Sequence, residues 1–282
     1  MDGAKQNGMQ QEKLEITYLA NTGLLISYRG TNLLLDALYG TEPHAFSSLP
    51  QGVYEDMLQG KPPFDRLSCL LFTHLHPDHF SPQMAEALLK KRPKTGLFLP
   101  DISGQALDAA LHAAYQSLLE TVQKQKIPCA LLTKKTDSAI YHIGEHIKVR
   151  AFHTAHLDDA YQDVQHVCYL LSFDGREVLF TADLDYVHET LWQVAAPGKE
   201  RKLTAVFVNP LFFHELTKPR FFKQQLDTEC LVVYHVPFPK DDAMRMLPML
   251  ERDAAAFSGR QHKNGQAMHI TVLSAPFQRV FL

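Results

Sequence analysis

The most informative segment of the chain reads Thr73-His74-Leu75-His76-Pro77-Asp78-His79, and its first residue ends the apolar run Leu-Ser-Cys-Leu-Leu-Phe-Thr at 67–73. An unbroken apolar run of this kind is typical of a strand buried on both faces. Because side chains alternate along an extended chain, His74 and His76 are expected on one side. Pro77 ends the strand, and the following turn lets Asp78 and His79 point beside the first pair.

Imidazole and carboxylate groups at this density are suitable ligands for zinc, manganese or iron. The segment offers four such groups within six residues, at His74, His76, Asp78 and His79. The alternative interpretation is a polar loop at a strand end that is rich in histidine by chance. The segment therefore indicates a candidate metal site.

The composition is that of an ordinary globular protein, because 45% of the 282 residues are hydrophobic and 21% are charged. The net charge of −3 provides no strong basic field for a nucleic acid. The four cysteines form no CxxC pair, so free thiols are expected. The polar residues 1–13 have no signal-peptide core and are expected to be a flexible tail, followed by a single domain at 14–282. With no apolar stretch of about 18 residues, we expect a cytoplasmic protein and no membrane partner.

Short apolar runs bounded by turn residues predict many strands. Asp174-Gly175 between two such runs is a strong type I′ hairpin signal, and Ser81-Pro82 is a typical helix start. Strands are expected at 14–20, 23–29, 31–36, 67–73, 96–100, 139–143, 146–152, 166–173, 176–182, 203–209, 230–236 and about 268–273. Helices are expected after Ser81 and at about 103–126, 187–195 and 241–256, and a polar loop at about 38–66. This order predicts an α/β protein with two sheets between outer helices.

The His-x-His-x-Asp-His pattern at the end of a strand resembles that of the metallo-β-lactamase-fold hydrolases. The likeness covers about residues 14–275. It is closest to a single-domain branch that includes ascorbate-6-phosphate lactonase and phospholipases D acting on N-acyl-ethanolamine lipids. The resemblance implies a four-layer αβ/βα sandwich with a one- or two-metal site at its edge.

The resemblance also implies a third histidine, a bridging carboxylate and a distal histidine. The segment 149–156 offers both His153 and His156, and the spacing in similar proteins favours His156. Thr181-Ala182-Asp183 resembles the family's Thr-Gly-Asp strand end, with Ala182 in place of glycine. His235 ends a late apolar strand. The implied ligand sets are His74, His76 and His156 for one ion and Asp78, His79 and His235 for the other, with Asp183 as the bridge.

Other residues are expected to support this site. Asp36 ends the third strand and would orient a ligand or loop instead of binding metal, and Thr73 and Thr181 would act similarly at two other strand ends. Substrate selectivity is expected in the loops 38–66, 157–166 and 211–224. The side chains named for substrate binding are His153, His214, Lys218 and Arg220, although a solvated surface loop is an equal interpretation for 211–224.

The expected function is a metal-dependent hydrolase with two divalent ions. Zinc is the first choice and manganese or iron are alternatives. A metal-bound hydroxide, oriented by Asp78, would cleave a phosphodiester, lactone or other ester bond in a small substrate. The basic residues Lys218 and Arg220 of the loop 211–224 suggest that this substrate is anionic. Three alternatives are a nuclease, a di-iron redox protein and a metal-binding protein without turnover. No nucleic-acid partner is expected, and the sequence does not predict the oligomeric state.

Overall fold

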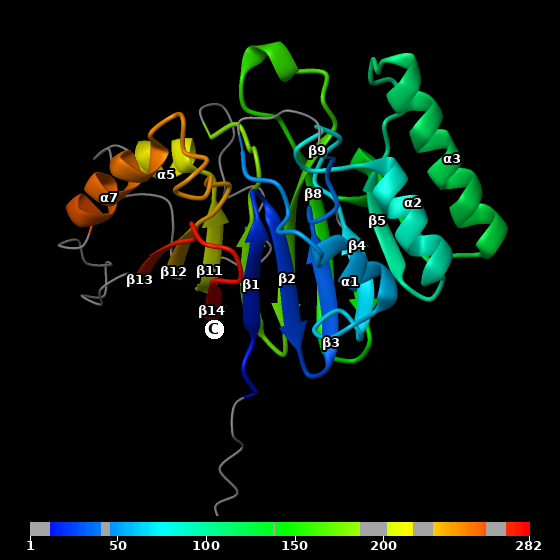
Figure 1. The fold of residues 1–282 in the computed structure, drawn as a ribbon, viewed down its shortest axis with the longest axis horizontal. Coiled ribbons are helices and arrows are strands. Elements are labelled where there is room, and N and C mark those ends of the chain that lie inside the picture. The colour runs from blue at the N-terminus through cyan, green and yellow to red at the C-terminus, as the bar shows by residue number, and fades with distance from the viewer. Residues whose placement is uncertain (1–11, 41–45, 138, 187–201, 217–227, 258–268) are drawn as a thin grey trace, which may run out of the picture.

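Two seven-stranded sheets form the centre of the molecule (Figure 1). The computed structural model describes residues 12–40, 46–137, 139–186, 202–216, 228–257 and 269–282. The first sheet has the order β14-β1-β2-β3-β4-β5-β6, and the second has the order β13-β12-β11-β10-β9-β8-β7.

The strands of the first sheet are β1 (Glu15–Ala20), β2 (Gly23–Tyr28), β3 (Thr31–Leu35), β4 (Leu67–Leu71), β5 (Gly96–Pro100), β6 (Cys129–Leu132) and β14 (Arg279–Phe281). Those of the second are β7 (Tyr141–Ile143), β8 (Ile147–Thr154), β9 (His166–Phe173), β10 (Arg176–Phe180), β11 (Leu203–Val208), β12 (Thr228–Val233) and β13 (His269–Val272). The helices are α1 (Val53–Gln59), α2 (Pro82–Lys91), α3 (Ala109–Gln125), α5 (Pro210–Leu216) and α7 (Met246–Phe257).

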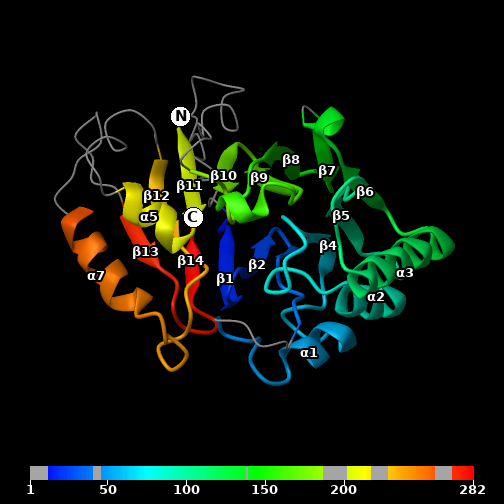
Figure 2. The same cartoon turned by 90° about the horizontal axis from the view of Figure 1, so that it is seen from above.

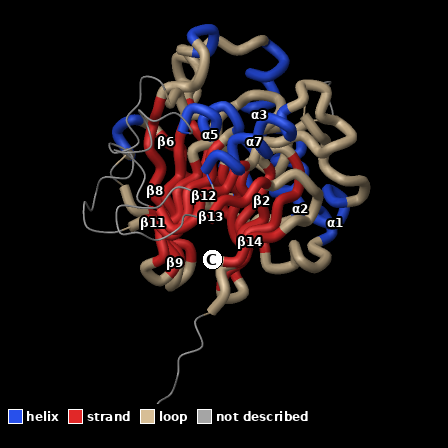
Figure 3. Tube along the Cα trace, turned by 90° about the vertical axis from the view of Figure 1, so that its left-hand side faces the viewer, coloured by secondary structure: helices blue, strands red, loops and turns tan. Residues whose placement is uncertain are grey.

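Three buried apolar clusters separate four layers. One cluster lies between the sheets and joins residues such as Tyr18 of β1 and Val232 of β12. A second packs α1, α2 and α3 on the outer face of the first sheet, and a third packs α5 and α7 on the outer face of the second. Seen from above, α2 and α3 lie on one side and α5 and α7 on the other (Figure 2), and the strands gather in the middle (Figure 3). The predicted four-layer αβ/βα sandwich is therefore confirmed.

Both sheets follow the same pattern of strand directions. In the first, β14, β1, β2 and β3 pair antiparallel, and β3, β4, β5 and β6 pair parallel. In the second, β7, β8, β9 and β10 pair antiparallel, and β10, β11, β12 and β13 pair parallel. Ligands of open α/β sheets bind outside the carboxyl ends of the strands. The segments after β4, β8, β10 and β12, which carry the predicted histidines and Asp183, leave such ends.

Most predicted elements are present, with some differences. The hairpin at Asp174 and Gly175 has positive φ at both residues, 48° and 93°, as a type I′ turn requires. The long helix begins at Ala109, later than predicted, because Asp108 caps it by accepting bonds from the N–H groups of Ala110 and Leu111. The predicted loops at 38–66 and 211–224 contain α1 and α5, and β6 and β14 were not predicted. The predicted helix at 187–195 lies outside the described residues.

The start of α2 follows the predicted cap, because the Ser81 hydroxyl accepts a hydrogen bond from the Met84 N–H at 3.3 Å. Replacing Ser81 by alanine leaves that N–H without its partner. We expect Ser81→Ala to lower the free energy of unfolding by about 0.5–2 kcal/mol, measured by urea unfolding. Ser81→Thr keeps an oxygen at this position and is the control; equal stabilities for both variants would contradict the role of the cap.

Candidate metal centre

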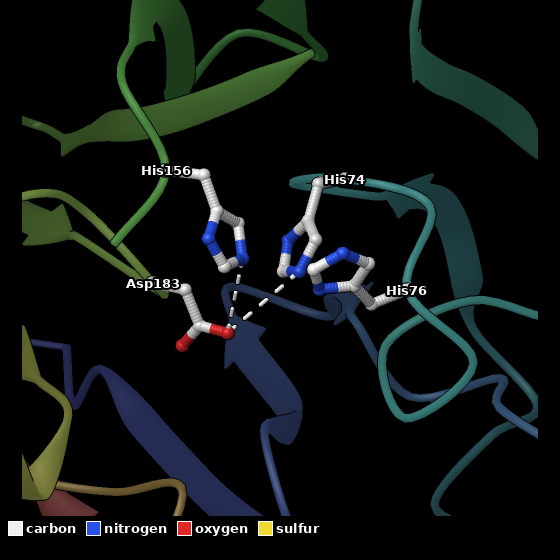
Figure 4. A group of neighbouring side chains, drawn as sticks. All are labelled: His74, His76, His156 and Asp183. Carbon is white, nitrogen blue, oxygen red and sulfur yellow. Dashed lines mark ion pairs between the residues drawn. The ribbon is translucent and has the colours of Figure 1, made fainter. Parts of the chain in front are cut away.

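A first group of side chains converges where the segments after β4, β8 and β10 meet (Figure 4). His74 and His76 follow β4, His156 follows β8 and Asp183 follows β10. One donor atom from each lies within 4.8 Å of the others. The Asp183 Oδ2 atom lies 3.7 Å from His74 Nε2 and 3.6 Å from His156 Nε2. Such a set could hold one divalent cation.

A second group contains Asp78, His79 and His235, whose donor atoms also lie within 4.8 Å of one another. Asp78 and His79 come from the segment after β4, and His235 comes from the segment after β12. The Asp78 Oδ2 atom lies 3.7 Å from His79 Nε2 and 3.5 Å from His235 Nε2. The two groups therefore share the segment after β4 and differ in the strands that complete them.

Asp183 also faces the second group. Its Oδ2 atom lies 3.3 Å from His79 Nε2, and its Oδ1 atom lies 3.5 Å from His235 Nε2. A carboxylate with two oxygens in this position could contact two cations at once.

The Asp36 carboxylate accepts hydrogen bonds from the beginning of the His-rich segment. Its Oδ1 accepts the N–H of Thr73 at 2.8 Å, and its Oδ2 accepts the Thr73 hydroxyl at 2.6 Å. The same Oδ2 lies 3.0 Å from His79 Nδ1. A carboxylate that binds one ring nitrogen fixes the orientation of the other. The contact of Asp36 with Nδ1 leaves His79 Nε2 facing the second group.

Two buried nitrogens of the first group have no hydrogen-bond partner among the described residues, namely His74 Nε2 and His156 Nε2. Their Nδ1 atoms are engaged, by the Thr73 hydroxyl at 3.0 Å and by the Leu157 carbonyl. Burying a polar atom without a partner is unfavourable. A cation beside Asp183 would satisfy both nitrogens, so the residues fit a divalent metal.

Burial and neighbouring charges together determine which members of the first group carry a proton. It lowers the pKa of His74 well below the ordinary histidine value, and burial together with His156 lowers the pKa of His76 to about 4. Burial alone would raise the pKa of Asp183, but His235 and His79 hold it well below the usual carboxyl value. At neutral pH the two imidazoles are therefore neutral and the carboxylate is ionised, which are the forms that bind metal.

His79 behaves differently. Burial alone would lower its pKa, but the carboxylates of Asp78 and Asp183 raise it well above the ordinary value. Likewise, burial alone would raise the pKa of Asp78, but His79 and His235 lower it. In the metal-free protein a proton on His79 offsets the buried negative charge. The site thus favours positive charge, which a cation would supply in place of that proton.

The remaining predicted residues lie elsewhere or take other partners. The Thr181 hydroxyl donates to the Phe207 carbonyl at 2.9 Å and so binds the end of β10 to β11. His153 Nδ1 lies 2.6 Å from Asp137 Oδ1, and His214 Nδ1 lies 2.8 Å from Asp253 Oδ2; neither histidine belongs to a donor group. Lys218 and Arg220 lie outside the described residues.

The structure adds residues that the sequence did not single out for the site. The Asn21 side-chain amide donates to the Asp78 backbone carbonyl at 2.6 Å, and the backbone carbonyl of Asn21 accepts the His235 N–H at 2.9 Å, so this turn residue connects both halves of the second group. Tyr161 is 44% exposed, and its ring centroid lies 4.7 Å from that of His76 and 5.1 Å from that of His156. It belongs to the loop 157–166, which was expected to set selectivity.

No protein-family model matches the chain, and no curated protein matches it. Several solved structures share its fold. One is Igni18, a metallo hydrolase from the archaeon Ignicoccus hospitalis, with a TM-score of 0.56 and 12% identity over 96% of this chain and 98% of that one. Another is an isothiocyanate hydrolase from Delia radicum gut bacteria, with a TM-score of 0.58 and 14% identity over 95% and 98% of the two chains.

The fold also occurs in CmlA, a diiron β-hydroxylase from Streptomyces venezuelae, with a TM-score of 0.56 and 16% identity. That match covers 96% of this chain but only 54% of CmlA. At these identities the likeness concerns the fold.

Among the described residues, no helix has the length and apolar character needed to cross a membrane.

Replacing His76 tests the first donor group. We expect His76→Ala to lower the metal content of the purified protein strongly while the fold survives, because the side chain is only partly buried and stands in a loop. Elemental analysis measures the metal, and circular dichroism reports the fold. His142→Ala, at an exposed position of β7, is the control. Full metal content in His76→Ala would refute the assignment of this group.

Proposed function

We propose that this chain is a metal-dependent hydrolase of small ester-type substrates. The observation that carries the proposal is the pair of donor groups joined at Asp183, with two buried imidazole nitrogens that have no partner among the described residues. Metal-dependent hydrolases among the fold neighbours support the same class of activity. The resemblance to the ascorbate-6-phosphate lactonase branch favours a lactone, phosphodiester or other ester bond and a small anionic substrate.

The proposed ligands of one ion are His74, His76, His156 and Asp183, and those of the other are Asp78, His79, His235 and Asp183. Zinc is our first choice, because neutral imidazole and carboxylate suit it, while manganese and iron remain alternatives. A divalent cation supplies two things when bound: it makes water more acidic, and it offsets negative charge that develops in the transition state.

The residues of the chain determine the side from which a substrate approaches. The side chains of His74 and His79 are fully buried, whereas those of Asp78 and Asp183 are 17% and 16% exposed. The centre is therefore accessible from the side of these carboxylates and of the partly buried His76. The role that we propose for Asp78 is to accept a hydrogen bond from an attacking water and to orient it toward the ester carbon or phosphorus. Its carboxylate is ionised at neutral pH, because His79 and His235 keep its pKa below the ordinary value.

Metal analysis combined with substrate screening tests the proposed function. We expect purified protein to bind up to two equivalents of a divalent metal and to hydrolyse at least one member of a phosphodiester, lactone and carboxylester panel. Removing metal with a chelator should abolish turnover, and adding zinc or manganese should restore it. Asp183→Asn serves as the negative control. It should lose both metal and turnover, because it removes the carboxylate that faces both donor groups. Absence of bound metal and of turnover with added zinc or manganese would overturn the proposal.

The diiron neighbour provides the reason to test a second function, an iron-dependent oxidation. The two functions differ in their need for an oxidant. A hydrolase works without oxygen and with zinc, whereas an iron oxygenase needs both iron and oxygen. Turnover by the zinc-loaded protein under anaerobic conditions would favour hydrolysis, and turnover only with iron in air would favour oxidation.

Tyr161 is proposed to contact the part of the substrate that does not react. Its partly exposed ring stands over His76 and His156 at the edge of the first group. Losing one aromatic contact removes about 0.5–1.5 kcal/mol of binding free energy, so Tyr161→Ala should raise KM about two- to tenfold. Tyr161→Phe keeps the ring and should show a smaller change, and metal content should be unchanged in both. Wild-type KM values for Tyr161→Ala with every substrate that the enzyme turns over would contradict this role.

A further inference from the structure

We propose that His166 is a positioning residue that fixes Asp183 between the two donor groups, an inference that rests on the proposed metal centre. His166 is the first residue of β9 and is 1% exposed. It belongs to neither donor group. Its ring centroid nevertheless lies 5.2 Å from that of His74 and 5.7 Å from that of His156, so it stands directly behind the first group.

Both ring nitrogens of His166 are engaged by neighbouring groups. The backbone N–H of Asp183 donates to Nε2 at 3.2 Å, and Nδ1 lies 2.7 Å from the hydroxyl of Thr154. Because Nε2 accepts a hydrogen bond, the ring is neutral and carries its proton on Nδ1, which donates to Thr154. A ring with both nitrogens occupied in this way is not a further metal ligand.

Strand register places the His166 ring between the end of β8 and the segment that follows β10. His166 lies opposite Thr154 in the antiparallel pair of β8 and β9. On the other side β9 pairs with β10, whose last residue Phe180 lies three positions before Asp183. One imidazole therefore connects the end of β8 with the peptide that carries the proposed bridging carboxylate.

The backbone of Asp183 is held at both of its polar groups. His166 accepts its N–H, and its carbonyl accepts the N–H of Leu157 at 2.7 Å, next to the proposed ligand His156. The preceding residue Ala182 has a φ of 44°, a left-handed conformation that is unfavourable for alanine. Without an acceptor at His166, nothing among the described contacts binds the Asp183 N–H in this strained turn.

Displacement of the Asp183 backbone would affect both donor groups. Its carboxylate oxygens lie 3.3–3.7 Å from four imidazoles, two on each side. Residues that orient metal ligands typically change metal affinity about 10- to 100-fold when they are mutated. Loss of the His166 acceptor should therefore weaken the binding of both ions, even though His166 belongs to neither donor group.

Two amide substitutions separate the proposed role from simple packing. His166→Gln carries its amide as far out as Nε2 and can still accept the Asp183 N–H, whereas His166→Asn is too short and reaches only the Thr154 side. We expect His166→Asn to lower zinc affinity about 10- to 100-fold for both equivalents, measured by competition with a chelator. His166→Gln should stay within about threefold of wild type, as should the control His112→Asn on the exposed face of α3.

Thermal unfolding of the metal-free proteins shows whether the variants fold. If His166→Asn does not fold, Thr154→Val against Thr154→Ser tests the bond that keeps the imidazole proton on Nδ1 and leaves Nε2 free to accept the Asp183 N–H. Zinc affinity should then be lowered for valine alone. Wild-type zinc affinity in a folded His166→Asn, or in Thr154→Val, would overturn this inference while leaving the metal centre intact. A wild-type protein that binds no zinc, manganese or iron would overturn the proposed function, and this inference with it.

Discussion

The carboxylate of Asp183 is the point on which the centre depends. Four imidazoles, from the segments after β4, β8 and β12, lie within 3.7 Å of its two oxygens. This arrangement exists only because the two sheets pack face to face through their shared apolar core. A negative charge that is so closely surrounded is stable only with positive charge beside it, whether a proton on His79 or a cation. Packing and electrostatics thus determine the same small region.

Several residues at this edge adopt the left-handed backbone conformation, which is uncommon outside glycine. Asn21, Asp36, Ala182 and His235 have φ values of 51°, 44°, 44° and 61°. Asn, Asp and His tolerate this region better than most residues, but alanine does not. Such strain persists where the surroundings over-determine the conformation, and it is common at functional sites. Here each turn lies at or just beyond a strand end and redirects the chain at the donor groups, so the positions of the side chains depend on the strain.

The sequence was most informative where chemistry and strand ends coincide. The His-rich segment after β4 could be recognised locally, because an apolar run stops at a run of potential metal ligands. Asp36, Asp183 and His235 also end apolar runs, but they were singled out through the resemblance to a known family. The helix α5 also had a local signal, since Asn209 precedes Pro210 and its side chain accepts the Phe212 N–H. The helix α1 had none, because Gly52 precedes it and no side chain caps it.

The supporting contacts of His166 and Asn21 could not be predicted from the sequence. Their roles depend on which residue lies across a strand pair or on which turn packs under a distant loop. A single sequence does not contain this register, so nothing distinguishes His166 from the other histidines at strand positions. The same reason explains β14, a short strand that is defined only by pairing with β1 at the other end of the chain.

The origin of the donor groups in both halves of the chain has a consequence for the lifetime of the protein. Each donor group takes residues from both halves of the chain, because His74 to His79 precede β7 whereas His156, Asp183 and His235 follow it. An ion in either group would therefore tie one half to the other, and separating the sheets would require its release. Ligands that bind only the folded state stabilise it in proportion to the logarithm of their free concentration. The supply of metal in the cell would then govern how slowly proteases degrade this protein, in addition to whether it is active.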